Sequence, residues 1–273
     1  MCLARLSVRS VPACSQGTAM RLASRILSIF SLTLAASGAL GADFSRDEVQ
    51  AMLAAAPTAA RPSFAGRSLA GLDLHGLDFS AVDFSGADLS DADLRRTKLV
   101  GAKLVGAKLP RAMLNFAWIM RADFSHADLS GALLETLVVS AGMETLPDEA
   151  AKFVGANLSG AKVTARFSLD DMRDADLSHL RASADMHNQS MGLIRTEFAR
   201  ANLANANFEG AALAHVNFEF AKLRRANFSG ADLSDADFAG ADLAGADLTG
   251  AKTTGAKFTS ASLGGVKGLS PPR

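Results

Sequence analysis

The sequence lacks most of the residue types that carry thiol or base-stacking chemistry. It has no tyrosine, one tryptophan and two cysteines in 273 residues. Cys2 and Cys14 both lie in an N-terminal segment with the features of a secretory leader, so the mature chain would have no disulfide, no reactive thiolate and no lipid-modified cysteine. With so few aromatic residues outside a core, a surface that stacks nucleic-acid bases is not expected.

An excess of charge of one sign is also missing. The chain has 28 basic and 28 acidic residues, and four of the arginines fall within residues 1–42, which contain no acid. Removing that segment leaves 24 basic residues against 28 acidic ones. A mildly acidic chain does not offer the basic surface of a nucleic-acid-binding protein, so no nucleic-acid partner is expected.

Motifs with catalytic or metal-binding spacing are absent as well. The five histidines, His75, His126, His179, His187 and His215, form no zinc-binding spacing. The best candidate ligands cluster around Asp185 and His187, and they include His179, Asp170, Asp171, Asp174 and Asp176. We interpret this cluster as solvated surface, and we expect no metal, no cofactor and no enzymatic activity.

What the chain does have is a five-residue repeat. Residues 226–248 read ANFSG ADLSD ADFAG ADLAG ADL, which is Ala, then Asp or Asn, then Leu or Phe, then two small or polar residues. The large apolar residue recurs every five positions from Phe198 to Leu248 and, earlier, from Leu69 to Leu134. A period of five fits neither a helix nor an alternating strand. A coil that turns a corner every five residues explains it.

This pattern resembles the A(D/N)LXX signature of the pentapeptide-repeat family, from about Phe64 to Leu263. The resemblance implies an all-β fold, a right-handed quadrilateral β-helix in which each pentapeptide forms one side and four form a coil of about twenty residues. The Leu or Phe and the Ala two residues before it would fill the interior, so no pore is expected.

The N-terminal part precedes the repeat. Residues 1–42 are predicted to be a signal peptide, with Met20 as an alternative start, Arg21 and Arg25 as its basic region and residues 26–36 as its apolar region. The alternative is an uncleaved anchor, but the apolar run is short for a membrane span. Residues 43–63 contain a helix start, where Ser45 and Glu48 form a capping box, and we expect this helix to cover the end of the solenoid.

The repeat itself divides into two regular runs, residues 64–134 and 198–263, around an irregular region, residues 135–197. Residues 264–273 form a tail without the C-terminal elements that family members use for pairing, so we expect a monomer. Outward residues twenty apart should stack as ladders of alternating charge. The predicted ladders are Asp78–Lys98, Asp83–Lys103–Asp123, Asp88–Lys108–Asp128, Lys222–Asp242, Asp232–Lys252 and Asp237–Lys257.

One stretch replaces the outward polar residues with large apolar ones. Met113 and Trp118 stand where Asp is usual, and Phe116 and Met120 are predicted to face outward too. Such a patch either binds a partner or is covered by residues 135–152, which lose the repeat. That segment is predicted to be a distorted coil or a loop folded back on Trp118. One-residue slips of the register follow near Phe167 and before Phe198.

These features favour an exported, periplasmic or secreted, non-enzymatic scaffold without stable membrane insertion. It would bind a protein or another envelope component through its side, at Met113, Phe116, Trp118 and Met120. Two alternatives remain open, because function is carried by sites and not by folds. One is a cytoplasmic DNA mimic that binds a topoisomerase, which needs a strongly acidic rod. The other is a carbohydrate-active β-helix, which needs clustered carboxylates beside a groove.

Overall fold

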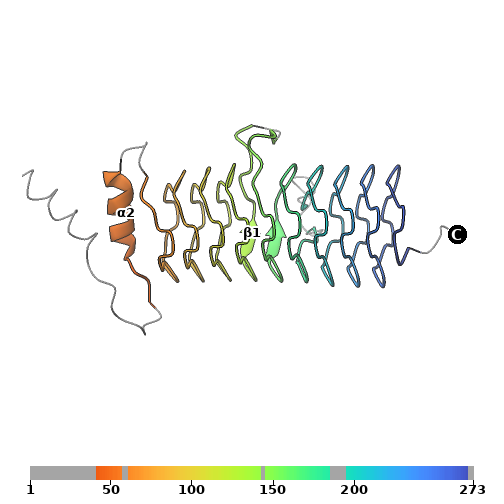
Figure 1. Cartoon of the computed structure of the whole chain (residues 1–273), viewed down its shortest axis with the longest axis horizontal. Helices are drawn as coiled ribbons and strands as arrows, with labels where there is room; N and C mark the ends of the chain where they lie inside the picture. The colour runs from red at the N-terminus through yellow and green to blue at the C-terminus, as the bar shows by residue number, and fades with distance from the viewer. Residues whose placement is uncertain (1–40, 57–60, 143–144, 185–194, 270–273) are drawn as a thin grey trace, which may run out of the picture. The chain divides into compact units, whose positions relative to one another are not determined.

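The computed structural model describes residues 41–56, 61–142, 145–184 and 195–269, so the predicted signal peptide falls almost entirely outside the described residues. Three elements are regular enough to be labelled: helix α2 (Arg46–Ala55) and the strands β1 (Leu133–Glu135) and β2 (Lys162–Thr164), which pair in parallel. Single parallel bridges connect successive turns in the rest of the coil, and Figure 1 shows the path of the backbone. No helix in the described part of the chain is long and apolar enough to cross a membrane.

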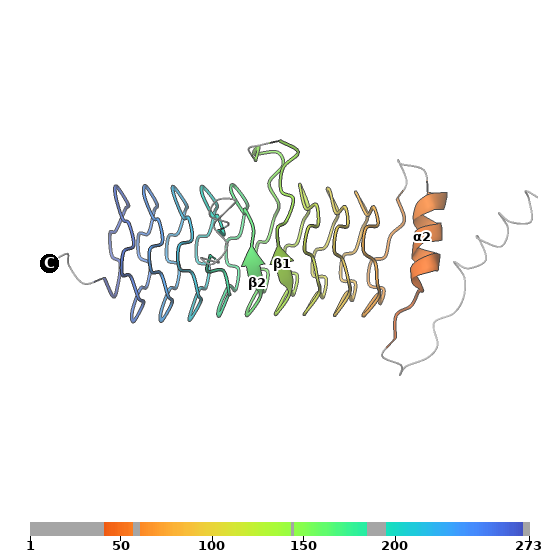
Figure 2. The same cartoon turned by 180° about the vertical axis from the view of Figure 1, so that it is seen from behind.

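The coil has four sides, and each side carries one outward column of residues. The columns start at Ser63 (side 1), Ser68 (side 2), Asp73 (side 3) and Asp78 (side 4), and each residue in the regular runs bridges the one twenty positions further on. The next residue of the chain then donates its N–H to the following coil, as Phe79 does to the carbonyl of Lys98 at 2.7 Å. Each side is thus a ladder of parallel bridges between stacked coils, and Figure 2 shows the stacked coils from behind.

The interior is filled by the Leu or Phe of each pentapeptide and the Ala two residues before it, as predicted. Leu89 and Ala87, for example, are both 0% exposed. Phenylalanines twenty residues apart stack face to face: the ring centroids of Phe198 and Phe218 lie 5.3 Å apart, and those of Phe218 and Phe238 lie 4.9 Å apart. Burial of these side chains is the main favourable contribution to folding.

The corners of the coil need a left-handed backbone, and many of them use glycine for it. Gly240 has φ +66° and lies one coil beyond Phe220, whose φ is 56°. A Cβ atom on Gly240 would lie 2.5 Å from the Phe220 ring. Glycine is therefore required there both for its backbone angle and for the space under the ring.

The spacing of twenty breaks at three places in the middle of the coil. Asp123 bridges Lys152, 29 residues on, because residues 139–142 and 145–151 belong to a loop outside the coil (Figure 1). Lys152 then bridges Asp171 after 19 residues. Arg166 bridges Glu197 after 31 residues, a span that includes residues 185–194, which lie outside the description. The slip predicted near Phe167 thus coincides with the span of 19 residues, and the slip predicted before Phe198 falls in the span of 31 residues.

The segment 135–152 is part coil and part loop, but the loop is not folded back on Trp118 as one of the two predictions had it. Glu135 belongs to β1 and Val138 bridges Trp118, so the first residues continue the coil. The following loop is closed by the Glu149 carboxylate, which accepts hydrogen bonds from Ser140 Oγ at 2.7 Å and from the backbone N–H of Ala141 at 3.2 Å. The loop does not cover Trp118, because the Trp118 side chain remains exposed.

Helix α2 begins at a capping box and contacts the first coil. Ser45 accepts a hydrogen bond from the Glu48 N–H, and the Glu48 carboxylate accepts one from the Ser45 N–H at 2.8 Å. Phe44 packs edge-on against the core residue Phe64 with ring centroids 5.6 Å apart, and Val49 is fully buried. These contacts fasten the helix to the apolar interior at the start of the coil.

Candidate partner-binding surface

Two aromatic side chains lie near each other on the outside of the coil. Phe116 occupies the corner between sides 3 and 4, Trp118 stands on side 4, and they are 46% and 39% exposed. One coil earlier, the Arg96 guanidinium lies 5.7 Å from the Phe116 ring centre and the Lys98 ammonium lies 5.9 Å from the Trp118 ring. We call Arg96, Lys98, Phe116 and Trp118 the aromatic–cation patch.

Apolar side chains extend this patch along the coil. Trp118 bridges the half-buried Val138 on side 4, and on the adjacent side 3 the half-buried Met113 bridges the half-buried Leu133. Met120, however, is only 6% exposed, and the prediction that it faces outward is wrong. It lies at the corner where the loop rejoins the coil, since the N–H of the adjacent Arg121 donates to the Glu149 carbonyl. The sequence could not show this, because the loop breaks the repeat.

The carboxylates beside the patch already have basic partners. Asp78 lies 3.5 Å from Arg61 and 3.9 Å from Lys98. Burial raises the pKa of Asp78, but hydrogen bonds from Ser80 and the two cations outweigh this effect and lower the pKa overall. Glu135 pairs with Lys162 at 2.6 Å. Within the described residues, Arg96 makes no ion pair, so the patch carries surplus positive charge.

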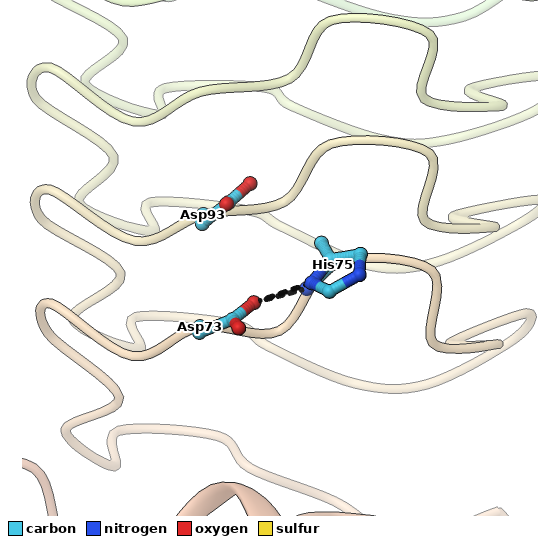
Figure 3. A group of neighbouring side chains, drawn as sticks. All are labelled: Asp73, His75 and Asp93. Carbon is cyan, nitrogen blue, oxygen red and sulfur yellow. Dashed lines mark hydrogen bonds and ion pairs between the residues drawn. The ribbon is translucent and has the colours of Figure 1, made fainter.

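The only group of possible metal ligands in the described residues is Asp73, His75 and Asp93 on side 3 (Figure 3). His75 Nδ1 lies 2.7 Å from Asp73 Oδ1, and this hydrogen bond is the largest cause that lowers the pKa of Asp73. Arg46 of helix α2 donates to Asp73 Oδ1 at 3.0 Å, and Arg95 engages both oxygens of Asp93 at 2.9 and 2.6 Å. A metal ion would have to displace both guanidinium groups. The arrangement fits an ion-pair network that holds helix α2 better than a metal centre.

The acidic cluster singled out in the sequence does not come together as a site. Asp185 and His187 lie outside the described residues. The remaining members point to separate partners: the Asp171 carboxylate pairs with Arg173, Asp174 accepts a hydrogen bond from Asn205, Asp176 accepts one from Asn207, and the His179 ring lies over Gly210.

Asp170 is the exception, because it lies inside the coil and not on solvated surface as predicted. It is 1% exposed, and its Oδ1 accepts a hydrogen bond from the Ala151 N–H at 2.8 Å. Its Oδ2 has no hydrogen-bond partner. Burial raises the pKa of Asp170 to about 8, and the hydrogen bond from Ala151 opposes that rise. A signal was present in the sequence, since Asp170 stands two residues before the core residue Met172, where Ala is usual.

The predicted charge ladders are present as backbone bridges between stacked residues. Three of the predicted pairs close to within 4 Å: Lys98–Asp78 at 3.9 Å, Lys252–Asp232 at 3.5 Å and Lys257–Asp237 at 3.5 Å. Asp242 instead pairs with Arg224 at 3.3 Å. Arg224 is a corner residue, so counting residues twenty apart does not predict this pair. These pairs are exposed and stabilise little individually.

Comparison with known protein families shows which family the chain belongs to. Residues 63–96, 87–125 and 97–135 match the family described as pentapeptide repeats (8 copies), and residues 191–267 match the pentapeptide repeat region. The chain belongs to the pentapeptide-repeat family. Members of this family are generally non-enzymatic structural or binding proteins.

Several solved pentapeptide-repeat structures are similar to this chain. HetL, which is involved in heterocyst differentiation regulation in Nostoc sp. strain PCC 7120, is 28% identical over 73% of this chain and 88% of its own, with a TM-score of 0.30. A protein from the Arabidopsis thaliana thylakoid lumen is 31% identical over 41% of this chain and 68% of its own, with a TM-score of 0.20. QnrB1, a plasmid-mediated fluoroquinolone resistance protein, is 20% identical over 70% and 84%, with a TM-score of 0.34. No curated protein matches the chain.

Proposed function

We propose that this pentapeptide-repeat protein is an exported, non-enzymatic scaffold that binds a macromolecular partner, a protein, through the aromatic–cation patch. The observation that carries the proposal is the joint exposure of Phe116 and Trp118 on neighbouring positions of one coil. Tryptophan, other aromatic residues and arginine are enriched among the interface residues that contribute most to the binding free energy. The coil supplies the rigid support that such a surface needs.

Phe116 stands at a left-handed corner of the coil, with φ 63°, and so do Arg96 one coil earlier and Phe220 at another corner. The backbone angle of Phe116 is therefore a property of the coil. The proposal is supported by the exposure of the Phe116 and Trp118 rings beside each other and beside two cations.

The proposal is tested by comparing which proteins co-purify with two variants in the native host. The double variant Phe116→Ala/Trp118→Ala removes both rings, and Phe220→Ala serves as the control, because Phe220 is 60% exposed at another corner. We expect one partner to be depleted at least about tenfold by the double variant, since each interface anchor contributes about 2 kcal/mol or more. The same partner should remain with Phe220→Ala. Finding no protein that depends on the two rings would contradict the proposal.

Export is supported by the basic and apolar regions within residues 1–42. Fractionation of the tagged protein, followed by N-terminal sequencing, should find a product that starts near Ala42 or Asp43 in the exported fraction. An uncut product in the cytoplasm would overturn export and return the topoisomerase-binding alternative to consideration.

A further inference from the structure

The two cations of the patch are placed to contact a ligand that covers the rings. Arg96 and Lys98 stand on the coil next to Phe116 and Trp118, each within 6 Å of a ring centre. The Lys98 side chain is 52% exposed, and Arg96 is exposed as well. A molecule packed on both rings would therefore lie beside two positive charges.

The charges around the patch are not balanced locally. Lys98 shares Asp78 with Arg61, and both oxygens of Asp93 are taken by Arg95. In the described part of the chain, Arg96 has a ring neighbour but no carboxylate neighbour within ion-pair distance. The chain after residue 42 has more acids than bases, so this local positive surplus runs against the overall charge.

We infer that the aromatic–cation patch binds an acidic, extended segment of a protein. Its carboxylates would pair with Arg96 and Lys98, and its apolar side chains would pack on Phe116 and Trp118. A protein fits better than an anionic polysaccharide, because Val138 continues the apolar column of Trp118 on side 4 and Met113 and Leu133 are apolar on the adjacent side 3. This inference rests on the proposed function and adds the chemistry of the partner to it.

The test uses purified protein and two fluorescent peptides. In the acidic peptide, Glu and Phe alternate with Ser between them, which places both on one face of an extended segment. In the neutral peptide, Gln replaces every Glu. We expect the acidic peptide to bind about tenfold more tightly, because two charge pairs of somewhat under 1 kcal/mol each amount to about that ratio. The difference in affinity between the two peptides should shrink at about 1 M salt, where charges are screened within about 3 Å.

Matched variants locate the effect. Arg96→Gln/Lys98→Gln should abolish the preference for the acidic peptide without changing the melting temperature, because both side chains are exposed. Lys108→Gln should change the binding of neither peptide. Lys108 has the same outward position in its pentapeptide as Lys98, but it stands on side 2 and not on side 4 with the patch. Trp118→Ala should weaken the binding of both peptides.

Each other outcome overturns the inference. Equal binding of both peptides, lost in Trp118→Ala, would reject the acidic partner and leave the proposed function intact. No binding of either peptide would reject the inference, and the co-purification experiment would decide separately whether the patch has a partner. Alginate, an anionic polysaccharide, is offered as a third ligand, and its binding in place of the acidic peptide would assign the patch to a polyanionic sugar.

Discussion

Replacing Asp170 with Asn should remove a pH dependence that this one buried carboxyl group gives to the stability of the coil. Asp170 lies among the core residues with one hydrogen bond, from the Ala151 N–H, and with Oδ2 unpaired. Burial raises its pKa from 3.8 to about 8 in the folded chain. An unpaired negative charge at this position is strongly unfavourable, so the folded protein keeps the group protonated below that pH.

The sign and size of the effect follow from this shift. Because the folded pKa is higher than the unfolded one, the contribution to stability is fully present below pH 3.8. It decreases as the pH rises and is lost once the pH passes about 8. One pKa unit corresponds to about 1.4 kcal/mol, so between pH 5 and pH 8 the free energy of unfolding should fall by about 4 kcal/mol on account of Asp170 alone.

The assay is urea or thermal unfolding of the wild type and Asp170→Asn at several pH values between 5 and 8. Asn keeps an oxygen that can accept the Ala151 N–H and cannot ionise, so the variant should gain stability relative to the wild type steadily with pH. Asp170→Ala is the control: it also cannot ionise, but it loses the hydrogen bond, at a cost of about 1 kcal/mol at every pH. Parallel stability curves for wild type and Asp170→Asn would refute the reasoning.

Four further changes test other parts of the structure. Phe116→Gly should raise the free energy of unfolding by up to about 1 kcal/mol in urea titrations while weakening partner binding, because it relieves a left-handed corner. Phe218→Ala should cost about 3–5 kcal/mol, since it empties the middle of a phenylalanine stack, and near-neutral stability would contradict the core packing. Ser45→Ala should cost about 1 kcal/mol through loss of the helix cap, and circular dichroism would show less helix. Gly240→Ala should destabilise the coil through both its backbone angle and the Phe220 ring, and the double variant with Phe220→Ala should recover part of the melting temperature.

Much of the solenoid could be predicted because its spacing is strictly local. The inward position of Leu89 or Phe218 follows from counting in fives, and the stacking of Lys98 on Asp78 follows from counting in twenties. Each side repeats the same hydrogen-bond ladder, so one coil predicts the next.

The rest depends on contacts that counting does not reach. Met120 is buried at the corner where the loop that ends at residue 151 rejoins the coil, and the length of that insertion is not part of the repeat. The charge of Asp170 predicts a surface position, although its place in the pentapeptide is an inward one and the side chain is buried. The repeat gives no signal for a corner residue such as Arg96, and only the structure places its guanidinium beside the Phe116 ring.

The central claim, that the aromatic–cation patch is a binding surface, is tested most directly by photo-cross-linking in the native host. A photoreactive residue at Thr136, the corner one coil beyond Phe116, leaves both rings in place, and the same residue at Lys108 on side 2 is the control. The account predicts one defined protein adduct from position 136, in the exported fraction, that disappears in a Trp118→Ala background. No adduct at position 136, or the same adducts at positions 136 and 108, would contradict it.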